Sequence, residues 1–380
     1  YASTSALALN SGTIKDAAGN AATLTLVSPG VINSLGANKA LIIDTTVPTV
    51  STVTSTTDDG SYMAGDVIAI TVNFSEAVTV TGTPQLTLET GSSDAVVDYA
   101  SGSGSTTLTF NYTVAAGHTS SDLDYASTSA LALNSGTIKD AAGNAATLTL
   151  ASPGATNSLG ANRALIIDTK APTAFTTGSA AATGGTVVAS KWNSTNTGLD
   201  VTVPIANDAS LNTTGTVQIQ GKVGSNSYAS LGDAATISAI NENKTVSITA
   251  AQLEALTGFA DAGVVTLTAI LTDAAGNAAT GTASSTTITI DQTVPAAFTT
   301  GSAVTTGGTV AAGKWNSTNT GLDVTVPIAN DASLNTTGTV QIQGKVGSNS
   351  YASLGDAATI SAINENKTVS ITAAQLEALT

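Results

Sequence analysis

Segments of domain length recur within this chain, and that repetition constrains its fold more than any other feature of the sequence. The segment YASTSALALNSGTIKDAAGNAATLTL at Tyr1 returns at Tyr125, and a different segment at Phe175 returns at Phe298. The periods are 124 residues (125 minus 1) and 123 residues (298 minus 175), the size of one β domain. Self-similarity at a fixed period indicates an array of tandem domains. Such a chain usually builds length or valency rather than one catalytic pocket.

The repeats are of two kinds, which we call A and B. Their order predicts the C-terminal part of an A repeat at 1–48, a complete A repeat at 49–172, a complete B repeat at 173–295 and the N-terminal part of a second B repeat at 296–380. The two B copies are identical from Lys191 to Thr257 of the first copy. Because the chain begins inside one repeat and stops inside another, we expect it to be a window on a longer array.

Each repeat closes with the same short connection. An apolar run leads into an aspartate, and a proline follows four residues later, at Asp44–Pro48, Asp168–Pro172 and Asp291–Pro295. Proline fixes its own φ and pushes the preceding residue into an extended conformation. A connection of this kind is stiff compared with a Gly/Ser tether. We therefore expect neighbouring domains to be held in an elongated array.

Within the repeats, apolar residues alternate with polar ones over short runs, which predicts half-buried antiparallel strands. The predicted apolar faces are Ile68, Ile70, Val72, Phe74 and Leu108, Phe110, Tyr112, Val114 in A, and Leu199, Val201, Val203, Ile205 and Val217, Ile219, Val223 in B. About seven such strands per repeat, separated by Gly, Asn and Asp turns, predict all-β, immunoglobulin-like β-sandwich domains in tandem. Thr249 and Gln252 have the spacing of a capping box and predict a short helix.

Composition excludes several classes of function. The formal net charge is −15 and the isoelectric point is about 4.1, so the chain is poor in the Lys and Arg that bind nucleic-acid phosphates. No apolar run approaches the roughly 20 residues that cross a bilayer, so we expect no direct membrane insertion in this segment. There is no cysteine, which excludes thiolate nucleophiles and thiolate metal sites. Stability must come from packing or from bound ions.

Few residues could carry catalysis. His118 is the one histidine, and it lies in a polar loop, AAGHTSSD, that B lacks. A Ser-His-Asp triad could use no other histidine, so we expect His118 to be a solvated loop residue and the chain to be no enzyme. Trp192 and Trp315 occupy the same position in the two B copies. They could form a sugar-stacking platform, or they could be large apolar residues that cover one end of a sandwich.

Acidic residues gather at the domain junctions once they are placed on a sandwich, because the entering linker and the turn between the last two strands share one pole. The expected sets are Asp44, Glu76, Asp140 and Asn144 before A, and Asp168, Asn207, Asp208, Asp273 and Asn277 before B, while Asp291 opens the third linker. Carboxylates and amide oxygens without His or Cys suit a hard cation, and Ca²⁺ accepts about six to eight oxygens. The alternative is that these residues only bond the local backbone of turns and linkers.

The DAAGN turns at Asp16–Asn20, Asp140–Asn144 and Asp273–Asn277, each followed by a strand and a linker, resemble bacterial Ig-like repeats. Such repeats occur in giant extracellular adhesins and biofilm-associated surface proteins. The run GSYMAGDVIAITVNFSEAVTVTGTPQLTL at Gly60–Leu88 is similar to another repeat of these proteins, so the resemblance covers essentially the whole chain. It implies an extracellular location at the bacterial cell surface and junctions that calcium rigidifies. It also implies that the partners are neighbouring repeats of the same protein.

The sequence therefore favours a non-enzymatic structural stalk of a bacterial extracellular adhesin, a spacer for adhesion or biofilm formation. Near-identical neighbouring repeats fit this role, because the length of a spacer depends on how many domains it has and not on differences among them. One alternative is a self-assembling extracellular filament or surface-layer protein, whose partners are like chains in a fibre or bundle. Another is an accessory carbohydrate-binding module of a secreted hydrolase, which would bind sugar through Trp192 and Trp315.

Overall fold

The computed structural model describes residues 1–331, 334 and 338–379, and these residues form an almost entirely β structure. The helices in this part of the chain are single turns of three to five residues, and none has the length and apolar character that a membrane crossing requires. The chain divides into two compact units, Tyr1–Ala171 with Ala274–Asn277, and Pro172–Asp273 with Ala278–Thr380. The prediction of an all-β chain is confirmed.

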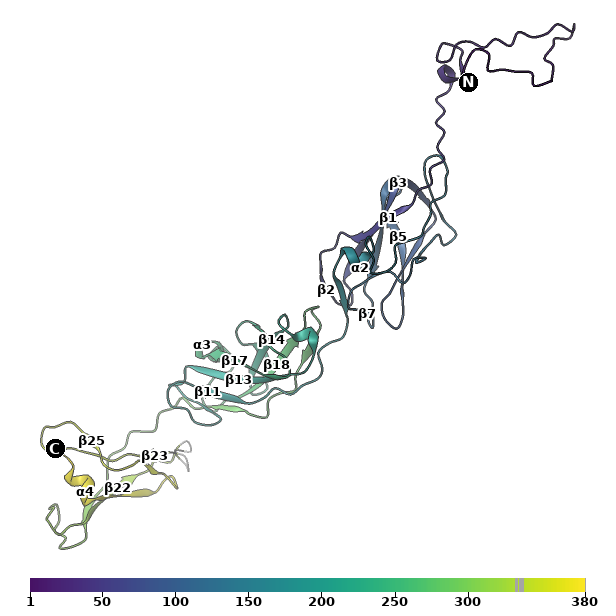
Figure 1. Cartoon of the computed structure of the whole chain (residues 1–380). Coiled ribbons are helices and arrows are strands. Elements are labelled where there is room, and N and C mark those ends of the chain that lie inside the picture. Colours follow the sequence, from purple (N-terminus) through teal and green to yellow (C-terminus); the bar gives the residue numbers. More distant parts are fainter. Residues whose placement is uncertain (332–333, 335–337, 380) are drawn as a thin grey trace. The chain divides into compact units, whose positions relative to one another are not determined.

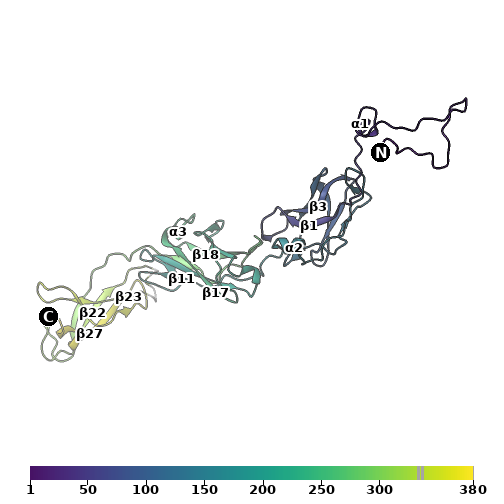
Figure 2. The same ribbon diagram turned by 45° about the horizontal axis from the view of Figure 1, so that its top comes forward.

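The complete A repeat, in the first unit, folds into two sheets. Its strands are β1 (Val50–Ser55), β2 (Gly60–Tyr62), β3 (Val67–Thr81), β4 (Gln85–Leu88), β5 (Ala95–Ser101), β6 (Ser105–Thr113), β7 (Thr119–Ser120), β8 (Leu131–Ala132), β9 (Thr137–Lys139) and β10 (Leu165–Asp168). One sheet has the order β1-β3-β6-β5-β4-β8 with β9 beside β3, and the other has the order β2-β10-β7. The short helix α2 (Leu159–Asn162), capped by Ser158, lies beside β1 in both views (Figures 1 and 2).

The alternating faces predicted from the sequence form the core of the A repeat. β3 pairs antiparallel with β6 so that Ile68 stands opposite Tyr112 and Ile70 opposite Phe110. These side chains are buried, together with the other members of the two predicted faces. Full burial of one such side chain contributes about 1.5–3 kcal/mol, so these paired rows hold the two sheets together.

The complete B repeat, in the second unit, is also a sandwich of two sheets. Its strands are β11 (Ala180–Thr183), β12 (Lys191–Trp192), β13 (Gly198–Ile205), β14 (Thr216–Val223), β15 (Ala229–Ser230), β16 (Ala235–Thr236), β17 (Glu242–Thr249), β18 (Val264–Thr272), β19 (Ala278–Thr280) and β20 (Ile288–Ile290), with a 3-10 helix at Ala209–Leu211. The sheet orders are β11-β13-β17 and β12-β20-β18-β14-β15, with β16 beside β14 and β19 beside β18. The predicted capping box is present, because Thr249 and Gln252 exchange hydrogen bonds at the start of α3 (Ala250–Glu254).

The N-terminal edge of each complete repeat contributes to both of its sheets. In A, β1 pairs antiparallel with β3, whereas β2 pairs parallel with β10, the last strand. In B, β11 pairs antiparallel with β13, whereas β12 pairs parallel with β20. The first and last parts of a repeat therefore lie side by side and point the same way. The last strand then runs directly into the linker aspartate.

The partial A copy, residues 1–48, forms α1 (Leu35–Asn38) and otherwise an extended trace without a named strand in its described residues (Figure 1). Its run Leu41–Ile43 matches Leu165–Ile167 of the complete copy. Ile43 is 92% exposed, whereas its counterpart Ile167 is 1% exposed between β2 and β7. The same residues become a core strand only when the earlier strands of the repeat are present.

The partial B copy forms the sheet β21-β22-β27 and two short hairpin pairs. Its elements are β21 (Ala303–Thr306), β22 (Gly321–Pro327), β23 (Thr339–Val340), β24 (Gln343–Gly344), β25 (Ala352–Ser353), β26 (Ala358–Thr359), β27 (Asn366–Thr372) and α4 (Ala373–Glu377). Trp315 is half-buried here, while the identical Trp192 of the first copy is fully buried. The difference shows how much of the core the last strands supply.

We expect residues 173–295 to fold alone and residues 296–380 not to, because the second fragment lacks the strands that bury Trp192 in the first. Thermal unfolding of the two isolated fragments, followed by circular dichroism, checks this. The first should melt in one cooperative transition, and the second should show none. A cooperative melt of the isolated 296–380 fragment would show that our repeat boundaries are wrong.

Candidate metal centre

The linker that enters the A repeat is held between two segments at Pro48 and Thr49. The amide of Ser75 donates to the carbonyl of Thr49 at 2.8 Å, and the amide of Thr49 donates to Oγ of Ser75 at 3.1 Å. On the other side, the amide of Thr147 donates to the carbonyl of Pro48 at 2.8 Å. These bonds bring the linker to Glu76, which lies where β3 breaks its register with β6.

The turn Asp140–Asn144 is built by its own aspartate. Oδ1 of Asp140 accepts from the amide of Asn144 at 2.8 Å, and Oδ2 accepts from Nδ2 of Asn144 at 2.7 Å. Gly143 has a φ of 96°, a conformation that favours glycine. Asp16 makes the same two bonds to Asn20, at 2.8 and 2.9 Å, although that turn is exposed. The turn is therefore a property of the local sequence.

Asn144 joins this turn to the linker. Its Nδ2 donates to the carbonyl oxygen of Asp44 at 3.1 Å, while Oδ1 of Asp44 accepts from the amide of Thr46 at 3.0 Å. The structure thus brings Asp44, Asp140 and Asn144 together, as the sequence predicted. Asn144 presents its amide nitrogen rather than its amide oxygen to the two acids. It acts as a donor that holds the turn against the linker.

Glu76 completes a group of three carboxylates. One oxygen from each of Asp44, Glu76 and Asp140 lies within 4.8 Å of those of the other two. Turn bonds account for both oxygens of Asp140 and for Oδ1 of Asp44, but Oε1 of Glu76 is buried and has no hydrogen-bond partner. Within the described part of the chain, none of the three takes part in an ion pair. A buried carboxylate oxygen without a partner is costly, so this position calls for a proton or a cation.

Glu76 and Asp140 differ in their readiness to ionise. Burial raises the pKa of Glu76, and the nearby charges of Asp44 and Asp140 raise it further. Burial also opposes the ionisation of Asp140. The hydrogen bonds from the Asn144 side chain and from the turn backbone outweigh that effect, however, and lower the pKa of Asp140. The negative charges of Asp44 and Asp140 therefore hinder the ionisation of Glu76.

The donor set fits a calcium ion. Ca²⁺ binds oxygen ligands at about 2.3–2.6 Å, so two ligands of one ion can be no more than about 5 Å apart. The oxygens of Asp44, Glu76 and Asp140 meet that limit. A set made only of carboxylate oxygens suits a hard cation rather than zinc or copper.

The linker that enters the B repeat shows part of the same arrangement. Oδ1 of Asp168 accepts from the amide of Lys170 at 2.9 Å. Asp44 of the first linker accepts in the same way from the amide of the residue two positions later. Nδ2 of Asn277 donates to the carbonyl oxygen of Asp168 at 2.9 Å, as Asn144 does to the first linker. Asp273, which opens this turn, is buried. The bond from turn to linker therefore recurs at successive repeats.

Asp208 and Asp291 make other contacts. Oδ1 of Asp208 caps the 3-10 helix by accepting from the amide of Ser210 at 3.1 Å and from Oγ of Ser210 at 2.7 Å. The amide of Asp291 donates to the carbonyl of Trp192 at 2.8 Å, which continues the pairing of β20 with β12. Among the described residues, the first junction alone brings three acidic side chains within reach of one ion.

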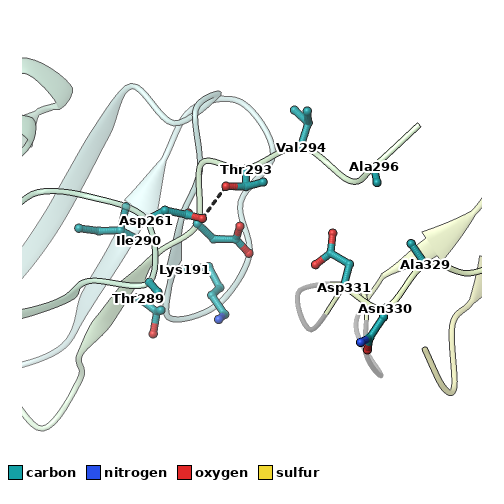
Figure 3. Close-up of a pocket in the computed structure, with 12 residues that line it drawn as sticks. Lys191, Asp261, Thr289, Ile290, Thr293, Val294, Ala296, Ala329, Asn330 and Asp331 are labelled. Atoms are coloured by element: carbon teal, nitrogen blue, oxygen red, sulfur yellow. Dashed lines mark hydrogen bonds between the residues drawn. The ribbon is translucent and has the colours of Figure 1, made fainter. Parts of the chain in front are cut away.

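A clamp on the third linker was not predicted from the sequence. Oδ1 of Asp261 accepts from the amide of Gln292 at 2.7 Å, and Oδ2 accepts from Oγ1 of Thr293 (Figure 3). The hydrogen bond from Thr293 and that from Gln292 lower the pKa of Asp261. Asp261 lies in an irregular loop, FADAG, and only its place beside the end of β20 shows this role.

His118 and Trp192 both contact other side chains of their own repeat. Oη of Tyr112 and Nδ1 of His118 are 2.8 Å apart, and the two rings stack, so His118 is half-buried rather than a solvated loop residue. Burial raises the pKa of Tyr112 to about 12, so its hydroxyl keeps its proton at neutral pH. Trp192 is fully buried and donates from Nε1 to Oε1 of Glu254 at 3.2 Å. Its indole offers no open face on which a sugar could stack.

The sequence matches no protein-family model, and a comparison with curated proteins gives no significant match. The geometry of the junctions and of the two sandwiches therefore carries the functional argument.

We expect Glu76→Gln to stabilise residues 1–172 at neutral pH in the presence of a chelator, because it removes the negative charge of a half-buried carboxylate that lies beside Asp44 and Asp140. In wild type, the raised pKa means that folded Glu76 takes up its proton before unfolded Glu76 does. Wild type should therefore gain stability as the pH falls toward 4.5, the ordinary value of a glutamate, and the variant should lack this gain. Below 3.8 both should lose stability, because the pKa of Asp140 is lowered in the fold.

Thermal unfolding as a function of pH measures this difference. Glu89→Gln is the matched control, because Glu89 is exposed on the same repeat, and its profile should follow that of wild type. Equal melting temperatures of wild type and Glu76→Gln in chelator at neutral pH would contradict the assignment of repulsion to Glu76.

Proposed function

We propose that this chain is part of a non-enzymatic spacer built from tandem immunoglobulin-like sandwiches of a bacterial extracellular surface protein. The strand pairing of B supports the fold. In chain order, β11, β13 and β17 correspond to strands A, B and E of one immunoglobulin sheet, and β14, β18 and β20 correspond to C, F and G of the other. The resemblance of the turns and linkers supports the surface location.

The observation that carries the spacer role is the repeated bond between turn and linker. Asn144 donates to the carbonyl of Asp44, and Asn277 donates to the carbonyl of Asp168. Each bond ties the Asp-to-Asn turn of a repeat to the linker by which the chain enters that repeat. A bond between turn and linker that both complete repeats share fits a protein whose function depends on how its domains are joined. In an enzyme we would instead expect the repeats to differ from one another at the site where catalysis takes place.

We also propose that calcium binds at the first junction through Asp44, Glu76 and Asp140. The ion would supply the positive charge that the buried oxygen of Glu76 lacks. The carboxylate of Asp44 belongs to the linker, while Glu76 and Asp140 belong to the sandwich. An ion shared among them would restrict the linker relative to the A repeat. In this way the site would make the connection rigid without any covalent link.

Calcium should therefore lengthen and stabilise the chain. In small-angle scattering, the maximum dimension of the 380-residue protein should fall when calcium is replaced by a chelator, because carboxylates without a counter-charge loosen the junction. The stabilisation lost should be about 2.7 kcal/mol when the free ion had stood at one hundred times its dissociation constant. Identical scattering profiles and melting curves in calcium and in chelator would mean that these acids are turn and linker residues only.

Two variants distinguish loss of the metal site from a change in the turn alone. Glu76→Gln keeps the turn and linker bonds, and it should remove calcium binding at this junction in a titration. Asp16→Asn changes the same turn in the partial copy, where Asp16 is exposed, and should leave binding as in wild type. Loss of binding in Asp16→Asn, or its retention in Glu76→Gln, would place the ion elsewhere.

His118→Ala should leave adhesion, assembly and the calcium response unchanged, because no carboxylate contact of His118 is found in the described residues and its partner is the hydroxyl of Tyr112. Adhesion assays and calcium titration of the variant measure this. A hydrolytic activity present in wild type and lost in His118→Ala would reopen the question of catalysis.

A further inference from the structure

In the complete A repeat, one edge of β5 has no partner strand over its first four residues. β5 pairs with β4 through Ala95–Asp98, and it meets β6 only at Tyr99 and Ser101. Residues 111–113 of β6 pair with β3 instead. β5 and β6 therefore diverge, and among the described residues no strand pairs with the second edge of residues 95–98. The repeat has its last strand, β10, in place, so this edge belongs to the folded domain.

The main-chain groups that point to the open edge follow from the pairing with β4. The amide of Tyr99 donates to the carbonyl of Pro84 at 2.8 Å. In an antiparallel pair, alternate residues of a strand bond the same partner strand. Val97 therefore bonds β4, whereas the N–H and C=O groups of Val96 and Asp98 point to the open edge. An edge of this kind presents donors and acceptors to which another strand can bond.

A hollow of about 600 Å³ opens beside this edge. Residues Asp94–Ala100 line one side of it, and Asn111–Thr113 with His118 line the other. Two carboxylates, those of Asp94 and Asp98, are in this lining, and no lysine or arginine is. All of the lining residues belong to the A repeat and are described by the structure. The space along the edge is therefore open, and its acidic groups favour a cationic occupant.

The exposed face of this segment has a distinctive order of side chains. Asp94, Val96 and Asp98 are exposed, Val96 by 58%, whereas the alternate residues Ala95 and Val97 are buried. In a paired strand, opposite charges that face each other stabilise the pair and like charges destabilise it. The matching strand therefore carries a cationic, an apolar and a cationic side chain at alternate positions. A second copy of this chain, with its net charge of −15, is disfavoured as the partner.

We propose that the open edge of β5 binds an extended basic segment of another protein by strand addition. The segment lies beside β5 and bonds the main-chain groups of Val96 and Asp98. Two of its cationic side chains lie opposite Asp94 and Asp98, and the apolar side chain between them lies opposite Val96. The backbone supplies affinity in this mode of binding, and the side chains supply specificity. The A repeat then serves as a docking site as well as a spacer, and this role is independent of the junctions.

The probe is the synthetic peptide TKTVTKT with blocked ends, added to the full 380-residue chain. We expect saturable binding that weakens with added salt, because the contacts between charges are exposed. Amide hydrogen exchange, followed by NMR, should slow at Val96 and Asp98, whose N–H groups face the edge. Exchange at Val97 should change little, because that amide already bonds β4. The peptide TTKKVTT has the same composition but places its lysines on opposite faces, and it should give no such protection.

Matched variants of the chain test the two kinds of contact. Asp94→Asn with Asp98→Asn should weaken binding roughly three- to tenfold. Asp233→Asn with Asp356→Asn removes two exposed charges outside the A repeat and should leave binding unchanged. Val96→Pro removes one N–H group from the open edge, not from the pairing with β4, and should weaken binding with both carboxylates in place.

Three results would overturn the proposal. The first is equal binding of TKTVTKT and TTKKVTT, which would indicate general attraction to an acidic surface. The second is binding without slower exchange at Val96 and Asp98. The third is undiminished binding by the chain with Asp94→Asn and Asp98→Asn. The charge variants keep every main-chain bond of β5, so they test the proposal even where Val96→Pro prevents folding.

Discussion

The last strand of each repeat both closes the core and begins the linker. β10 inserts Leu165 and Ile167 into the A core and ends at Asp168, and β20 inserts Ile288 and Ile290 into the B core directly before Asp291. In the partial A copy, where the neighbouring strands are missing, the matching residues Leu41–Ile43 are exposed. Burial of the strand is therefore a property of the pairing, and the position of each linker depends on that burial.

Much of the fold could be predicted from the sequence, because the features concerned are local or periodic. The alternation in Val67–Phe74 is enough to define an inner face, and the spacing of Thr249 and Gln252 is enough to define a helix start. The short strands β2 and β12 could not be predicted, since two or three residues show no period. Their pairing with the last strand depends on contacts between the two ends of the repeat.

The candidate site also has features that could be predicted from the sequence and features that could not. The aspartates and asparagines of the turns and linkers could be found from the sequence, because their side chains bond backbone a few residues away. The role of Asn144 as a donor, and the buried oxygen of Glu76, depend on the contacts that the linker makes with β3 and with the turn. Asp261 was missed for a related reason, because its partners Gln292 and Thr293 lie about thirty residues further along the chain. Tertiary bonds of that span leave no pattern in a single sequence.

The parallel pairing of the two ends of each repeat has a mechanical consequence. β2 runs beside β10, and β12 beside β20, in the same direction, so a pull on the two linkers draws the neighbours in opposite directions along their length. The bonds between such strands are loaded in shear and have to break together, whereas bonds in a hairpin pulled from its open end break one after another. Tension carried through these repeats therefore acts on the pairing in its most resistant direction.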